Sequence, residues 1–113
     1  MHEYGITNEV VHQILHACEN NKIDYPKIIS VELGELTTYQ KESVLFYFES
    51  FKKNNDKLKE AILKIKMIKG KIKCNACKKE SIVKPMPLIL CPKCSSLDTE
   101  VLDGNKIIIK EIN

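Results

Sequence analysis

The chain has 113 residues and a formal net charge of +3, and all 18 of its cationic side chains are lysines. This length suits one small domain, or one compact unit that carries a smaller module, and the absence of arginine disfavours sequence-specific reading of DNA bases. No apolar run approaches the roughly 18 residues that span a bilayer, and MHEYGITNEV lacks the pattern of a secretory signal, so we expect a cytoplasmic protein.

An amphipathic helix is predicted near the amino terminus, over about residues 3–21. Its apolar residues recur on one face, and polar residues that include His12 and His16 fall on the opposite face. The segment KIISVELG follows, in which apolar and polar residues alternate over residues 29–33 as in a half-buried strand. Gly34 marks the end of that strand.

A second amphipathic helix is predicted over residues 40–54, QKESVLFYFESFKKN, and it runs into a solvated segment rich in lysine and asparagine. The next segment, AILKIKMIK, alternates apolar residues with lysines, which suits a strand with one face on helices and the other in water. After a hairpin signal at residues 103–105, residues 106–112 form one more strand. These elements predict an α+β fold.

Residues 70–104 differ in composition from the rest of the chain. They have short apolar runs and place cysteines at predicted turns, which is typical of a ribbon of short strands. The ribbon is also basic, because lysines surround its cysteines: Lys71, Lys73, Lys78, Lys79, Lys84 and Lys93. This charge permits two further interpretations, a nonspecific contact with nucleic-acid phosphates or a surface for an acidic partner protein.

Four of the five cysteines stand in two CxxC pairs: Cys74, Cys77, Cys91 and Cys94. Two such turns can direct four thiolates to one point, which is the donor set of a tetrahedral Zn(II) site. Since no histidine or open coordination position is suggested nearby, we expect a closed structural site that folds the ribbon when metal binds. Redox dithiols and an iron site of rubredoxin type are the alternatives. Cys18 is expected to be a buried, unreactive thiol.

The first three residues, MHE, offer a second metal site. The His2 imidazole Nδ1 and the His2 amide nitrogen would close a six-membered chelate ring, and the amide nitrogens of His2 and Glu3 a five-membered one. Ni(II) and Cu(II) favour such nitrogen sets, and the first amides of a helix have no intrahelical acceptor. The alternative is a frayed, solvent-exposed terminus that binds no metal.

The fourth ligand would come from elsewhere in the chain, where Gln40, Glu42 or Glu35 could be near, or the coordination geometry would be more open. A separate possibility is a divalent cation held by His12 and His16, which are four residues apart on one helix face.

In this order and spacing, MHE, SVELGEL, FYFESF, CNAC, CPKC and the final DGNKIIIKEI resemble the HypA/HybF family of hydrogenase nickel-incorporation proteins. The resemblance covers essentially the whole chain. It implies two helices packed on a three-stranded sheet whose third strand is the carboxyl-terminal segment, with a four-cysteine zinc ribbon inserted before that strand. The nickel-binding domain would comprise residues 1–69, completed by residues 105–113, and the zinc-ribbon domain residues 70–104.

The resemblance also implies a function. The protein would be a nickel metallochaperone and not an enzyme: Ni(II) would be cargo held by His2 and the backbone of Glu3, and the four cysteines would hold structural Zn(II). It would deliver nickel to the [NiFe]-hydrogenase large subunit in concert with the HypB GTPase, and in some bacteria toward urease maturation factors. Gln40 corresponds to a carboxylate of some relatives, and the ribbon lacks the histidines that others carry.

Overall fold

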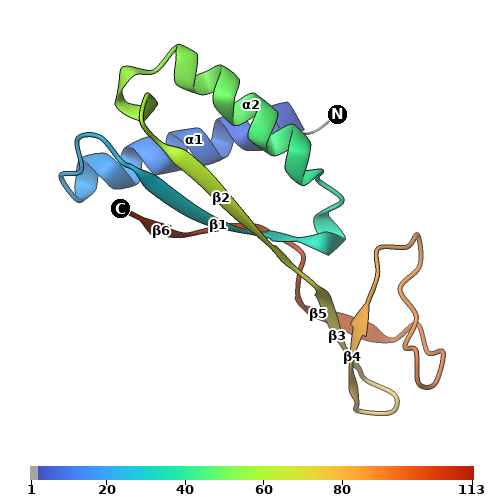
Figure 1. Ribbon diagram of the computed structural model, residues 1–113. Coiled ribbons are helices and arrows are strands. Elements are labelled where there is room, and N and C mark those ends of the chain that lie inside the picture. Colours follow the sequence, from blue (N-terminus) through green and yellow to red (C-terminus); the bar gives the residue numbers. More distant parts are fainter. Residues whose placement is uncertain (1–2) are drawn as a thin grey trace. The chain divides into compact units, whose positions relative to one another are not determined.

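The structure is a computed structural model that describes residues 3–113 (Figure 1). Within those residues it has two α-helices and two three-stranded sheets, which confirms the predicted α+β class. The chain divides into two compact units. The first comprises Met1–Glu32, Tyr39–Lys66 and Ile108–Asn113, and the second comprises Leu33–Thr38 and Met67–Ile107.

The helices of the first unit are α1 (Glu3–Asn20) and α2 (Lys41–Lys53). Helix α1 ends where Lys22 takes a positive φ of 58° and the Ile23 N–H donates to the Cys18 carbonyl over 2.9 Å. This arrangement satisfies a carbonyl that the last helical turn leaves without an intrahelical donor. Among residues 3–113, no helix is both long and apolar enough to cross a membrane.

The strands of the first sheet are β2 (Ile62–Ile68), β1 (Ile28–Gly34) and β6 (Ile107–Ile112), in that order across the sheet. Strand β6 runs antiparallel to β1, because Asn113 N–H donates to the Ile28 carbonyl at one end and Gly34 N–H donates to the Lys106 carbonyl at the other, each over 2.9 Å. The carboxyl-terminal segment is therefore the third strand, as predicted. Both helices lie along one side of this sheet (Figure 1).

The core of the first unit is formed by buried side chains of both helices, of the central strand β1, and of β2 with the segment before it. These residues are Val10, Val11, Ile14, Cys18, Ile29, Val31, Val44, Phe48, Leu58, Ala61 and Leu63. Leu58 corrects one sequence prediction, because it is fully buried within a segment that was expected to be solvated. A short 3₁₀ turn, Asp56–Leu58, brings this single apolar side chain into the core.

The second unit contains β3 (Gly70–Cys74), β4 (Glu80–Val83) and β5 (Thr99–Asp103), with β3 in the centre. Both neighbours pair antiparallel with β3, and Ile72 lies opposite Ser81 on one side and Val101 on the other. The pairing with β5 shifts register between Lys71 and Ile72. Ile72, Cys74 and Val83 are buried, so the inner face of this small sheet is apolar.

The glycine of the VELGEL motif makes a close backbone contact with the predicted hairpin turn. Leu36 N–H donates to the Gly104 carbonyl over 2.8 Å, and a Cβ at Gly34 would lie only 2.1 Å from that carbonyl oxygen. Gly104 itself has a φ of +84°, in the region that side chains disfavour. Both positions therefore require glycine.

Gly34→Ala is expected to destabilise the protein by about 3 kcal/mol, because the added methyl group meets backbone atoms that cannot rotate away. Gly5→Ala is the control, since a Cβ at Gly5 meets nothing within 4 Å and the residue is helical. That change should be neutral or stabilise by up to about 1 kcal/mol. Urea unfolding followed by circular dichroism measures both, and equal midpoints for the two variants would contradict the close contact.

Candidate metal centre

Four cysteine sulfurs converge in the second unit. The Sγ atoms of Cys74, Cys77, Cys91 and Cys94 all lie within 4.8 Å of one another. Cys74 and Cys94 are 3.5 Å apart and Cys77 and Cys91 are 3.7 Å apart, so each close pair joins one CxxC turn to the other. All four are free thiols.

The first CxxC turn begins at the end of β3. Lys78 N–H donates to the Cys74 carbonyl and Cys74 N–H donates to the Lys79 carbonyl, each over 2.9 Å. Cys77 N–H points at the Cys74 sulfur from 3.4 Å. The turn closes through a positive φ of 65° at Lys78. These hydrogen bonds hold the turn in a shape that directs both sulfur atoms toward the same point.

The second CxxC turn repeats this pattern. Ser95 N–H donates to the Cys91 carbonyl over 2.8 Å, and Cys91 N–H donates to the Ser96 carbonyl over 3.0 Å. Lys93 N–H lies 3.4 Å from the Cys91 sulfur, and Ser95 has a positive φ of 64°. Sequence reasoning predicted the two turns from their cysteine spacing but missed the left-handed residue that closes each one.

The thiols differ in acidity because their surroundings differ. The backbone N–H of Cys77 contributes most to lowering the pKa of Cys74 to about 6; the thiols of Cys94 and Cys77 and the Ala76 N–H act in the same direction, and burial opposes them. Ser96 N–H acts to lower the pKa of Cys94, but the neighbouring thiol of Cys74, burial and the other two thiols together raise that pKa to about 12. Four sulfurs this close do not all ionise without a cation between them. The donor set of four sulfurs at one point therefore fits a metal ion that prefers thiolates.

Within residues 3–113, no other group of three or more metal-ligating side chains comes together. His12 and His16 are exposed on α1, and His16 Nε2 lies 3.2 Å from Asn20 Nδ2. Chelation by this histidine pair stays a prediction.

His2, the predicted nickel ligand, lies outside the described residues, and Glu3, which follows it, is the first residue in the first turn of α1. Glu3 is only 6 % exposed, and its Oε2 accepts a hydrogen bond of 3.0 Å from the backbone N–H of Gln40. Gln40 is the residue that precedes α2. Of the three residues proposed from sequence to lie near the amino terminus, Gln40 is thus shown to contact Glu3.

Aromatic rings hold the same turn against α2. The Tyr4 ring meets the Tyr47 ring edge to face, with centroids 5.4 Å apart, and meets the Phe51 ring at 5.3 Å. Sequence reasoning gave Tyr4 no role. The signal that could have found it is the spacing of four residues between Tyr47 and Phe51, which places two rings on one helix face.

The sequence model of a family described as "Hydrogenase/urease nickel incorporation, metallochaperone, hypA" matches residues 1–113. The chain belongs to the HypA family. This membership confirms the resemblance drawn from the sequence motifs.

Individual HypA proteins match over nearly their full lengths. Proteins named "Hydrogenase maturation factor HypA" from Nostoc sp. and Aquifex aeolicus are 33% and 32% identical to this chain over 112 and 114 residues. Each match covers 99% of this chain, and the two cover 94% and 96% of the relatives respectively.

Two solved HypA structures share the fold. The solution structure of the Ni metallochaperone HypA from Helicobacter pylori has a TM-score of 0.75 at 23% identity, and the match covers 99% of this chain and 96% of that one. A second chain, described as the solution structure of HypA protein, has a TM-score of 0.71 at 23% identity, with 99% and 94% covered.

Proposed function

We propose that this protein is a nickel metallochaperone that binds Ni(II) as cargo and delivers it for maturation of the [NiFe]-hydrogenase large subunit. The observation that carries the proposal is the match of residues 1–113 to a family described as a nickel-incorporation metallochaperone. That match favours this function over the alternative of a zinc-ribbon nucleic-acid-binding protein. Delivery of a metal needs no catalytic step, so we propose that the protein is not an enzyme.

The proposed nickel ligands are the His2 imidazole and the backbone amide nitrogens of His2 and Glu3. Glu3 is the first residue of α1, and the first amides of a helix have no intrahelical acceptor. Its carboxylate accepts the Gln40 N–H, which ties this end of the helix to the residue before α2. The helix dipole disfavours a cation at this end, so binding should depend on deprotonated amides and weaken as the pH falls.

The four cysteines are proposed to hold structural Zn(II), because a closed set of four thiolates leaves no coordination position for substrate. We assign the zinc-ribbon domain to residues 70–104 and the nickel-binding domain to residues 1–69 completed by residues 105–113. Free cysteines suit a reducing compartment, which supports action in the cytoplasm.

The proposed partners are the [NiFe]-hydrogenase large subunit, which receives the nickel, and the HypB GTPase. Urease maturation factors are proposed as further recipients, because the matching family is described as serving both hydrogenase and urease.

A transfer assay tests the function. Untagged, zinc-loaded protein carrying radioactive ⁶³Ni is mixed with the purified nickel-free precursor of the large subunit, and the two are separated by size after a fixed time. We expect nickel to move to the precursor and to remain with the chaperone when serum albumin replaces the precursor. Equal loss of nickel to both acceptors would refute directed delivery.

A further inference from the structure

The second unit exposes an apolar loop that neither metal site uses. Residues 85–90 read PMPLIL, six apolar residues in a row. Met86 is 49% exposed, Leu88 65% and Leu90 39%. Exposed apolar runs of this length are unusual in soluble proteins and mark surfaces that bind another molecule.

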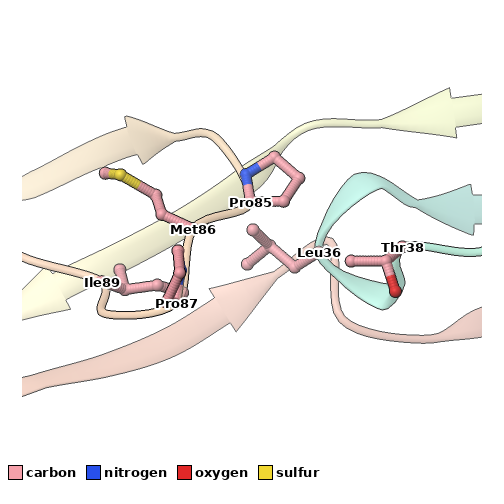
Figure 2. Close-up of a pocket in the computed structure, with 6 residues that line it drawn as sticks. All are labelled: Leu36, Thr38, Pro85, Met86, Pro87 and Ile89. Carbon is pink, nitrogen blue, oxygen red and sulfur yellow. The ribbon is translucent and has the colours of Figure 1, made fainter.

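The loop borders a hollow of about 350 Å³ within the same unit, lined by Leu36, Thr38, Pro85, Met86, Pro87 and Ile89. Figure 2 shows the Leu36 side chain pointing from the 3₁₀ turn Glu35–Thr37 toward the prolines of the loop. Proline fixes the backbone φ, so two prolines around Met86 hold the hollow in shape before anything binds. Methionine then supplies an adaptable apolar wall. A hollow of this size suits one or two apolar side chains.

Charge restricts the kind of molecule that fits. The second unit contains eight lysines against five acidic residues, and the segment around the loop, residues 69–97, contains seven lysines against one acidic residue, Glu80. That acid is engaged, since its carboxylate lies 3.0 Å from Lys71 Nζ. Lys84, directly before the loop, is exposed. A second copy of the chain would bring the same positive charge to the contact, whereas carboxylates would be attracted to it.

We propose that the PMPLIL loop and its hollow dock an acidic, apolar segment of a partner protein. One or two large apolar side chains of that segment enter the hollow, and its carboxylates face the lysines. A lipid surface shares the charge preference, but a preformed concave hollow takes single side chains better than a flat bilayer does. The proposal does not depend on nickel binding.

The test uses the full, zinc-loaded chain and a fluorescein-labelled synthetic peptide of two leucines flanked on each side by four aspartates. Fluorescence anisotropy should show saturable binding. Binding should be at least tenfold weaker when serines replace the leucines, and also when lysines replace the aspartates. Leu88→Thr and Met86→Thr should each weaken binding of the original peptide about tenfold, and Lys84→Glu should weaken it most at low salt.

Ile82→Thr is the matched control. Ile82 is 57% exposed, but it lies opposite Lys71 in the sheet and so occupies the face away from buried Val83. Its replacement should leave peptide affinity unchanged. Zinc content and circular dichroism check that each variant folds, and Leu88→Thr decides the outcome if Met86→Thr loses zinc.

Four results would overturn the proposal. The first is no saturable binding of the peptide, and the second is an equal loss of binding in Ile82→Thr. The third is a dimer in analytical ultracentrifugation that Leu88→Thr abolishes, which would assign the loop to a second copy. The fourth is sedimentation with phosphatidylserine vesicles that Leu88→Thr abolishes while the peptide does not bind, which would assign it to a membrane.

Discussion

His2→Ala is expected to abolish nickel binding while zinc content and the fold stay as they are. In the proposed nickel site, the imidazole would be the side-chain ligand that brings the metal close enough to displace the amide protons of His2 and Glu3. Without the imidazole, the backbone nitrogens would have to replace water on the metal ion with no side-chain ligand to hold it. The loss should exceed the roughly 10- to 100-fold that removal of a ligand's hydrogen-bond partner costs in other metal sites.

Isothermal titration and X-ray absorption on untagged protein measure this effect. His12→Ala is the matched control, since His12 is an exposed histidine further along the same helix. That variant should bind nickel as tightly as the parent protein. Retained nickel affinity in His2→Ala would contradict the assignment of His2 as a nickel ligand. A loss confined to His12→Ala would instead assign the site to the His12 and His16 pair.

Removal of zinc is expected to unfold residues 70–104 while α1 and α2 persist. The ribbon has a small apolar core, and each of its CxxC turns holds a residue with positive φ, Lys78 or Ser95. Such backbone conformations are costly, and they persist where surrounding bonds impose them. Apparent zinc binding free energies on the order of 10 kcal/mol in zinc-finger peptides are large enough to decide whether a module of this size folds.

Amide NMR spectra before and after complete chelation measure the effect residue by residue. Signals of the ribbon should collapse to random-coil positions, while those of the helices keep their dispersion. Cys77→Ser should reproduce this state without a chelator, and Cys18→Ala, which removes a buried thiol outside the cluster, should retain zinc. Unchanged ribbon signals after full zinc removal would mean that the thiolates are dispensable for folding.

Much of the fold could be predicted because its signals are local. The apolar periodicity of the two helices, the alternation around Val31 and the turn before β6 predicted the element order correctly. Leu58 could not be placed this way, because one leucine among lysines and asparagines has no periodicity, and its burial depends on helices distant in sequence. The contact between Gly34 and Gly104 is likewise set by tertiary packing.

In the candidate sites too, features set by local sequence could be predicted, and contacts set by tertiary packing could not. Cysteine spacing alone predicted that four sulfurs would meet, because each CxxC turn carries its own geometry. The fourth nickel ligand was left open in the sequence, with Gln40, Glu42 and Glu35 as residues that could be near. The fold shows that the Gln40 N–H contacts Glu3, but it does not choose the ligand. The nickel role of His2 stays a prediction.

The bond between Gln40 and Glu3 has an evolutionary consequence, because its donor is a main-chain N–H. Every residue except proline carries that donor, so substitution at position 40 leaves the attachment of the amino-terminal turn intact. The side chain at this position takes no part in this hydrogen bond. Exchange of the Gln40 amide for a carboxylate therefore keeps this hydrogen bond to Glu3.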